Sequence, residues 1–445
     1  MNAEHGRKVR PWFWFFLNFP FGATSGFVSV TLGYILKGYG VSDGKIAGLI
    51  ALNTLPHTWK FFWSPVADTT LTRKTWYRIA NLASCATILA IAFVPITRPP
   101  ITWDWRTWIV PGTVPSLIGT LVFLNAVAIT VLGMAVEGLM AHATPSEERG
   151  RAAGWFQGGN LGGLGFGGGI ALLIAEQFST RAAFISLAAI LFCCTFMLRF
   201  VPEAPRVTAT GSAAKRASAA DALREFLGAL WAVLKDLWSM MSSRRGIIGL
   251  TICFLPIGSA AAQNLFSAIA GRWGASASVV AITTGMIGGL VALGGCLAGG
   301  WVSDKLGRRM AYAVSGGFLG IVAIAMGLAP RNEVTYAIFT LAYTFGGGVS
   351  YACFTGLVLD IIGKGAVATK YNALASLSNI PIWYMTLVCG WASDKHGPVH
   401  MLFVDAGSEF IGIAILVVVI AIVRPGKERA LPAHLATEVA ESHDR

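Results

Sequence analysis

The sequence predicts an all-α membrane protein with twelve transmembrane helices, arranged as two pseudo-symmetric halves of six. Of its 445 residues, 55% are hydrophobic and only 13% are charged, whereas a soluble domain carries about 25% charged residues. The apolar residues recur in runs close to the ~20 residues that a helix needs to cross a bilayer. Because backbone groups in lipid must bond within the chain, we expect these runs to be helices.

Turns rich in Gly and Pro separate most of the expected spans. The spans cover residues 11–36, 43–66, 75–97, 114–141, 152–176, 181–201, 247–270, 277–302, 309–328, 333–361, 369–390 and 401–423. The expected domains are a first half (1–201), a cytoplasmic linker (202–246), a second half (247–424) and a cytoplasmic tail (425–445). In the linker, Leu227, Trp231 and Trp238 recur at helical spacing among charged residues, which favours an amphipathic helix on the membrane surface.

The formal net charge of +12 lies in the predicted loops. With the N-terminus in the cytoplasm, 24 of the 34 Lys and Arg residues fall on the cytoplasmic side and 8 on the other side. This bias follows the positive-inside rule and predicts a multi-pass protein of the cell inner membrane with both termini cytoplasmic. The charge therefore does not indicate nucleic-acid binding. The expected partners are the bilayer and a small-molecule substrate, with protons as a further candidate. We expect a monomer that uses no cofactor or metal.

An internal repeat supports the two-half arrangement. The stretch from Gly38 to Asp68 parallels the stretch from Arg272 to Asp304, since each has a small turn, a long apolar helix and a terminal Asp. Two parallel repeats of six helices place a substrate path at their interface, with the binding site near the middle of the bilayer.

A charged turn after the eighth span carries a family motif. It reads Gly300-Trp-Val-Ser-Asp304-Lys-Leu-Gly307-Arg308-Arg309 and resembles motif A of the major facilitator superfamily, G-x-L-A-D-x-x-G-R-[KR]. Gly300 is expected to permit close helix approach and Gly307 a tight turn. The resemblance implies a secondary transporter with alternating access, rather than an enzyme, with Asp304, Arg308 and Arg309 forming contacts at the gate between the halves.

Other charged residues fit the same gate. The turn after the second span keeps Asp68 and Arg73 but lacks the glycines of the motif. Glu137 and Asp360 fall near the predicted cytoplasmic ends of spans four and ten. In the superfamily such acids pair with motif-A arginines, so a gate salt bridge is favoured here and proton coupling is the alternative. Asp405 and Glu409 lie in span twelve, and the sequence assigns them no role.

The second span indicates a branch of that superfamily. Leu55-Pro-His-Thr-Trp-Lys60-Phe-Phe-Trp63-Ser-Pro65-Val-Ala-Asp68 is similar to the segment L-P-x-x-x-K-F-L-W-x-P-x-x-D of the peptide/acetyl-coenzyme A transporter group, which includes AmpG-like muropeptide permeases. The resemblance implies a muropeptide, siderophore or acyl-CoA-like substrate. The fourth span departs from that group, because Asn125 and Glu137 are its only strongly polar residues. The alternatives are a sugar or drug porter of another branch and a transport-dead sensor.

Asn53, His57 and Lys60 are spaced to share one helical face. A lysine inside a span costs roughly 3 kcal/mol unless it is paired or hydrated, which favours a face turned to a central cavity and an anionic or zwitterionic solute. His57 is then a candidate proton carrier. Two competing interpretations are a Lys60 that reaches the membrane surface and a His57 that only packs. The other polar candidates for substrate binding are Asn18, Asn125, Gln157, Asn160, Gln263, Asn264, Tyr351 and Asn379.

The charge bias generates a topology prediction. A cysteine at Ser212→Cys, in the basic linker, should not react with a membrane-impermeant maleimide added to intact cells, because the linker is expected in the cytoplasm. Phe178→Cys, in the predicted external turn between spans five and six, should react. Both variants are compared with the unsubstituted chain, whose seven cysteines all lie in apolar runs, and are labelled again after lysis. Labelling of the linker cysteine in intact cells would reverse the topology.

Overall fold

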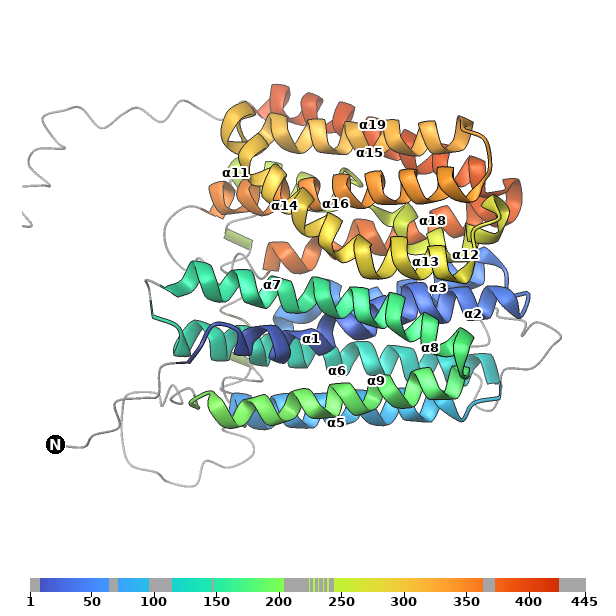
Figure 1. Ribbon diagram of the computed structural model, residues 1–445. Helices are drawn as coiled ribbons and strands as arrows, with labels where there is room; N and C mark the ends of the chain where they lie inside the picture. The colour runs from blue at the N-terminus through green and yellow to red at the C-terminus, as the bar shows by residue number, and fades with distance from the viewer. Residues whose placement is uncertain are drawn as a thin grey trace, which may run out of the picture.

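The computed structural model describes residues 9–63, 71–95, 114–145, 148–203, 244–362 and 373–423, with seven positions between 224 and 239. All regular secondary structure in these residues is helical. Figure 1 shows the helices before residue 203 packed beside those after residue 244, with nearly parallel axes. The predicted all-α fold is confirmed.

The first half is built from six helical segments, several of which change helix type along their length. They are α1 (Phe13–Gly26) continued by η1 (Phe27–Leu32) and α2 (Gly33–Gly38); α3 (Asp43–Thr54) with η2 (Leu55–Phe62); α5 (Arg73–Ala92); α6 (Val114–Ala143); α7 (Arg149–Gly165) with η5 (Phe166–Ile170) and α8 (Ala171–Gln177); and α9 (Thr180–Cys194) with η6 (Thr195–Phe200).

The second half follows in the same manner. Its helices are α11 (Arg244–Phe254); η7 (Ala261–Leu265), α12 (Phe266–Ile269) and η8 (Ala270–Trp273); α13 (Ala277–Val280), η9 (Ala281–Met286) and α14 (Ile287–Leu306); α15 (Arg308–Leu328); α16 (Glu333–Ile362); α18 (Asn379–His396); and α19 (Pro398–Val423).

Nine helices of the described part of the chain are long and apolar enough to cross a membrane. The three remaining predicted spans, the second, third and seventh, are also helical where they are described. Helix α5 carries Arg73, Lys74 and Arg78 in its first two turns, which lowers its mean hydropathy. The second span turns into a 3-10 helix after Thr54, and the seventh is interrupted.

The seventh span is not the continuous helix expected over 247–270. Helix α11 ends at Phe254 and regular structure resumes at Ala261. Within this break, Pro256 lacks a backbone N–H, while Gly258 and Ala260 have φ angles of 67° and 50°, in the left-handed region that favours glycine. The sequence Pro256-Ile-Gly258 therefore contained the signal for a helix break. The break borders the cavity described below.

Glycines set the distance between the first and fifth spans. A Cβ at Gly163 would collide with the carbonyl oxygen of Phe19, and a Cβ at Gly167 with that of Ala23. These glycines belong to the glycine-rich run Gly158–Gly169. Close backbone approach through small residues is the usual means of helix association in lipid. The run continues into the π-helical turn η5.

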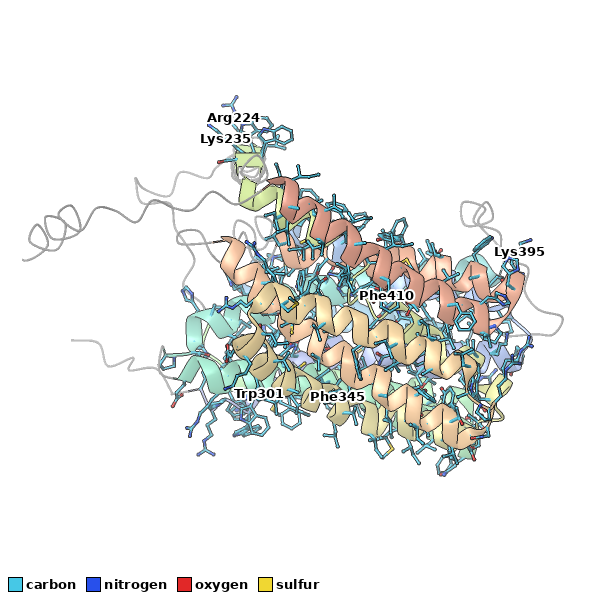
Figure 2. All side chains as sticks on the ribbon, turned by 90° about the horizontal axis from the view of Figure 1, so that it is seen from above. Arg224, Lys235, Trp301, Phe345, Lys395 and Phe410 are labelled. Carbon is cyan, nitrogen blue, oxygen red and sulfur yellow. The ribbon has the colours of Figure 1, made fainter. Side chains whose placement is uncertain are left out.

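The linker helix is described at a few positions only. Residues 224, 227, 228, 231, 235, 238 and 239 are helical, and Leu227, Trp231 and Trp238 are exposed. Figure 2 shows Arg224 and Lys235 together on this segment, to one side of the helices near one end of the bundle. The rest of the predicted linker, including 204–223, lies outside the described residues, as does the tail from 424.

The close contact between Gly285 and Gly169, where the two halves meet, leads to a prediction on stability. A Cβ at Gly285 of η9 would overlap the backbone of Gly169 in η5, so Gly285→Val must push the halves apart. Overpacking costs about 1–3 kcal/mol, and we expect the thermal unfolding midpoint of the detergent-solubilised protein to fall by several degrees. Gly294→Val is the control, because nothing lies within 4 Å of a Cβ there. Equal midpoints for the two variants would contradict this close contact.

Candidate functional site

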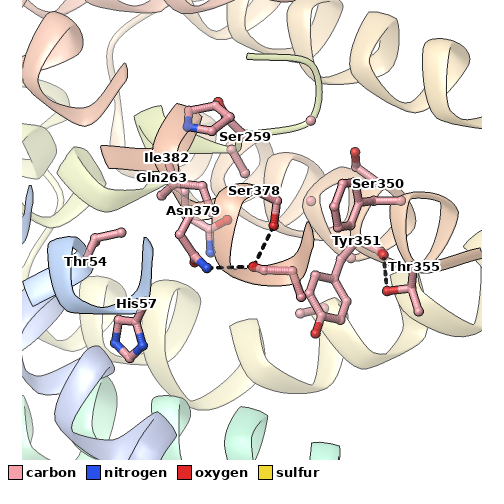
Figure 3. A pocket seen from close by; sticks show the side chains of 18 of the residues that line it. Thr54, His57, Ser259, Gln263, Ser350, Tyr351, Thr355, Ser378, Asn379 and Ile382 are labelled. Carbon is pink, nitrogen blue, oxygen red and sulfur yellow. Dashed lines mark hydrogen bonds between the residues drawn. The ribbon is translucent and has the colours of Figure 1, made fainter. Parts of the chain in front are cut away.

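A cavity of about 420 Å³ lies between the two halves. Its wall in the first half comes from α1, α3, η2 and α7, and its wall in the second half from the break in the seventh span, η7, α14, α16 and residues 375–382. Figure 3 shows Thr54 and His57 on one side and Gln263, Asn379 and Tyr351 among the side chains that face them. Both halves therefore contribute polar groups to one space.

Nine of the eleven side chains predicted for substrate binding line this cavity. They are Asn53, His57, Lys60, Gln157, Asn160, Gln263, Asn264, Tyr351 and Asn379. Their position as polar residues inside apolar spans indicated them, but the same signal also selected Asn18 and Asn125, which do not line the cavity. The convergence of the nine from five separate segments depends on how the two halves pack together.

Asn18 and Asn125 lie elsewhere, and the side-chain amide nitrogen of each bonds to a neighbouring helix. The Asn18 side chain donates to the carbonyl of Phe156 at 2.9 Å. The Asn125 side chain donates to the hydroxyls of Ser84 and Thr87 at 2.8 and 3.0 Å. Both residues are buried. The structure gives them interhelical hydrogen bonds and does not bring them to the cavity.

The change of helix type in the second span positions His57 and Lys60. Pro56 lies at the junction of α3 and η2, where its missing N–H removes one bond to the preceding turn. In a 3-10 helix, residues three apart lie above one another, so His57 and Lys60 share one face. The His57 ring contacts Phe21 edge-to-face at 5.1 Å between ring centres. Both His57 and Phe21 line the cavity.

Lys60 forms an ion pair with Glu137 of α6. The Nζ to Oε1 distance is 3.3 Å, and the two side chains are 16% and 29% exposed. The family resemblance predicts that Glu137 pairs with an arginine, and the sequence left two positions open for Lys60, the cavity lining and the membrane surface. The structure instead pairs these two with each other. Because an ammonium has three donors, this contact leaves Lys60 donors for a bound anion.

The break in the seventh span supplies cavity residues that the sequence analysis missed. Leu255 and Ile257 to Ala260 line the cavity. Tyr312 of α15 donates to the carbonyl of Ile257 at 2.6 Å, and Tyr384 of α18 donates to the carbonyl of Phe254 at 2.9 Å. The turn residues Pro256 and Gly258 were the available signal. Their role in the cavity wall could not be predicted from the sequence, because it depends on α15 and α18, whose tyrosines bond the backbone carbonyls at the break.

The gate residues are only partly described. Asp68 lies outside the described residues, and the side chain of Asp360 is likewise not described. The guanidinium of Arg73 lies against Gly138, next to Glu137 in sequence. Arg308 donates to the carbonyl of Gly356 in α16 at 2.9 Å. Asp304 and Arg309 are exposed.

The two motif glycines differ in role. Gly307 has a φ of 77° at the turn between α14 and α15, a conformation suited to glycine. Gly300 does not mediate the expected close helix approach, because a Cβ there would meet nothing within 4 Å. The close contacts of α14 with α16 occur at Gly295 and Gly299, whose Cβ atoms would overlap the carbonyls of Phe345 and Val349. The motif glycine therefore lies one position beyond the contact surface.

Hydrogen bonds between the halves join the end of the bundle opposite to the Gly307 turn. Ser42 donates to Asp394 at 2.8 Å, and Ser393 donates to Asp43 at 2.7 Å. Asp43 is also paired with Lys37. Figure 2 places Lys395, next to this contact in sequence, far from Trp301 of the motif. This end of the cavity is closed by direct contact between the halves.

The sequence matches one family of known proteins. The sequence profile of the Major Facilitator Superfamily matches residues 14–382. A search of curated proteins found no significant match to the sequence.

Solved transporters have a similar structure. A D-xylose-proton symporter matches with a TM-score of 0.65 at 14% identity, over 92% of this chain and 96% of that chain. The inward-open xylose transporter XylE from E. coli matches at 0.67 and 12%, over 94% and 97%. A POT family transporter in complex with a thioalcohol-conjugated peptide matches at 0.68 and 10%, over 93% and 96%. At these identities the similarity concerns the fold.

The Lys60–Glu137 pair generates a prediction on stability. Lys60→Met leaves the partly buried Glu137 charge without its partner, which should cost about 1–3 kcal/mol, between the values for exposed and buried pairs. Lys60→Met/Glu137→Gln removes both charges and should recover most of the loss in a thermal unfolding assay. The exposed Lys395→Met is the control. A double variant less stable than Lys60→Met would exclude the pair as the cause.

Proposed function

This chain belongs to the Major Facilitator Superfamily, and we propose that it is a secondary active transporter that moves a small anionic or zwitterionic solute across the cell inner membrane by alternating access. The observation that carries the proposal is the polar cavity of about 420 Å³ between the halves. Alternating access by rocking of the halves requires a site at the interface of the two repeats. That site must be closed at one end by contacts between the repeats. Family membership makes the chain a transporter rather than an enzyme.

The conformation supports an inward-facing state. The positive-inside bias assigns the Gly307 turn and both termini to the cytoplasm. The Ser42–Asp394 and Ser393–Asp43 hydrogen bonds then close the external end. In this state Arg308 bonds within the second half. We infer that Asp304, Arg308 and Arg309, with Asp68, Arg73 and Asp360 as further candidates, contact the opposite half when the cytoplasmic end closes.

Lys60 supports the charge preference. Within the described lining, it is the single Lys or Arg side chain. Its pairing with Glu137 lowers the cost of holding a cation in the membrane, and its remaining donors suit a carboxylate or phosphate. A zwitterionic solute could use both members of the pair. The cavity volume is in the lower part of the ~300–1,000 Å³ range of ligand pockets, which favours a small peptide-like solute over an acyl-CoA.

The branch remains part of the proposal. Lys60, Trp63, Pro65 and Asp68 match the second-span segment of the AmpG-like group in sequence, and the last two lie outside the residues that the structure describes. The division at 202–246, the linker helix on the membrane surface and the monomeric state are proposed on sequence grounds. Coupling to protons is proposed because carboxylates lie within the spans, and a symporter with the same fold moves D-xylose with protons.

A neutral, hydroxyl-rich solute such as a sugar is a second candidate. Gln157, Asn160, Gln263 and Asn379 line the cavity, and each amide offers both donors and an acceptor. If Glu137 neutralises Lys60 throughout the cycle, these amides become the main recognition groups. Xylose transporters share the fold.

Uptake by reconstituted protein tests the proposal. We expect proteoliposomes to accumulate at least one member of a panel of muropeptides, dipeptides, siderophores, acyl-CoA and D-xylose. For an anionic or zwitterionic solute, Lys60→Gln/Glu137→Gln should raise KM about tenfold or more, because a hydrogen bond to a charged group is worth about 1.5–3 kcal/mol. Lys395→Gln is the control.

Two outcomes contradict the proposal in different ways. Uptake of no panel member by protein that still unfolds cooperatively would favour the sensor. Uptake of D-xylose with an unchanged KM in the double variant would favour the sugar porter and exclude Lys60 as an anion ligand.

A further inference from the structure

Two carboxylates lie on one face of α19, outside the cavity lining. Asp405 and Glu409 are one helical turn apart and fully buried, each with 0% exposure. Helix α19 is among the membrane-spanning candidates. Because acidic groups at membrane depth are costly, they are usually functional. The mechanism described above uses neither residue.

Asp405 is held by neutral donors from two neighbouring helices. The Tyr343 hydroxyl of α16 donates to Oδ2 at 2.6 Å. The Cys389 thiol of α18 lies 3.8 Å from Oδ1, within bonding range for sulfur. Neither contact supplies a positive charge.

Glu409 contacts the back of the cavity wall. The backbone N–H of Gly258, in the break of the seventh span, donates to Oε2 at 2.7 Å. A Cβ at Gly316 of α15 would lie 2.8 Å from this same oxygen, so a glycine there leaves room for the carboxylate. The other oxygen, Oε1, is buried and has no hydrogen-bond partner among the described residues.

The titratable groups around the pair are neutral donors. They are Tyr312 on α15, Tyr343 on α16, and Tyr384 and Cys389 on α18, while α11 contributes the buried Cys253. Within the described part of the chain, neither carboxylate has an ion-pair partner. Two ionised carboxylates one turn apart in an apolar interior would repel each other and lack solvation. A bound proton relieves both costs.

We propose that Glu409 and Asp405 form a proton-binding site, with Oε1 of Glu409 as the exchangeable position, and that its occupancy controls the cavity wall at Gly258. The proposal rests on the transporter function proposed above and places the coupling proton in the second half rather than on His57. A proton arrives from cavity water, bonds to Oε1 and leaves as a proton on the other side of the membrane. No other bond is made or broken.

Two serine hydroxyls lie near Gly258, the residue that Glu409 contacts. The Ser350 side chain occupies the space beside the Cα of Gly258 where a Cβ would project, and the hydroxyls of Ser350 and Ser259 are buried without a partner among the described residues. Both serines and Gly258 line the cavity. A hydroxyl can both donate and accept a hydrogen bond, so the proposed proton route from cavity water to Glu409 passes these two serines.

Protonation acts on the wall through one hydrogen bond. An ionised carboxylate accepts a hydrogen bond more strongly than a neutral one, so deprotonated Glu409 holds Gly258 tightly and Glu409 protonated at Oε1 holds it more weakly through Oε2. Tyr312 still anchors the carbonyl of Ile257 in either state. Because coupling between two binding sites is reciprocal, a proton that loosens Gly258 also changes the affinity of the cavity for its solute.

Infrared difference spectroscopy tests the site with the proton itself as the ligand. We expect the wild-type protein to keep a protonated-carboxyl band at pH values where an ordinary Glu, with a pKa of about 4.3, is ionised. Glu409→Gln, which retains an acceptor for Gly258, should abolish this band. Asp405→Asn, which retains an acceptor for Tyr343, should shift its titration. Glu176→Gln, an exposed acid on α8, should leave it unchanged. A band that persists in Glu409→Gln overturns the proposal.

Transport separates this inference from the proposed function. For a panel solute that accumulates, Glu409→Gln should reduce accumulation driven by a pH gradient at least tenfold while solute exchange continues, and Glu176→Gln, at the exposed acid on α8, should retain the gradient response. Gradient-driven accumulation at the wild-type level in Glu409→Gln refutes the proton role. Loss of the band in Glu409→Gln, with no solute transported by the wild type, supports the proton site and rejects the transporter function.

Discussion

Irregular backbone inside a bilayer needs partners from within the protein, because lipid offers neither donors nor acceptors. The break at residues 255–260 meets this requirement through side chains of the outer helices. Tyr384, Tyr312 and Glu409 bond the backbone groups of Phe254, Ile257 and Gly258. The break is tolerated where it borders a polar cavity on its other side. The shape of the cavity wall thus depends on contacts that α15, α18 and α19 make with the break.

Close contacts at glycines also determine how the helices around the cavity pack together. In the first half they bring α7 against the backbone of α1, and in the second half they bring α14 against α16. The π-helical turns η1, η5 and η9 extend these surfaces to the closed end, where Thr31 donates to the carbonyl of Gly167 at 2.8 Å and Gly169 meets Gly285. π-Helical turns are frequent at functional sites. Here they form the seam on which the halves meet, while the cavity remains open between their polar faces.

The charged groups inside the bundle are accommodated in two ways. Lys60 and Lys37 each pair with a carboxylate, Glu137 and Asp43, which reduces the cost of burial. Asp405 and Glu409 have only neutral donors around them. A paired lysine can serve as a fixed charge for a ligand, whereas an unpaired buried carboxylate gains stability by binding a proton. The two proposals therefore assign different tasks to the two halves: solute charge in the first and proton binding in the second.

The sequence by itself determined the number and approximate limits of the helices, because apolar runs of membrane length can satisfy their backbone only as helices. It also indicated most polar cavity residues, since an amide or a lysine in such a run needs a partner or water. It did not pair Lys60 with Glu137, which are 77 positions apart, and it expected close packing at Gly300 that occurs at Gly299 instead. The role of Pro256 and Gly258, and the burial of Glu409 behind them, were decided by tertiary structure. The local sequence pattern indicates that a polar or charged group within a span needs a partner. Which partner it receives is decided only by the packing of helices that are distant in the sequence.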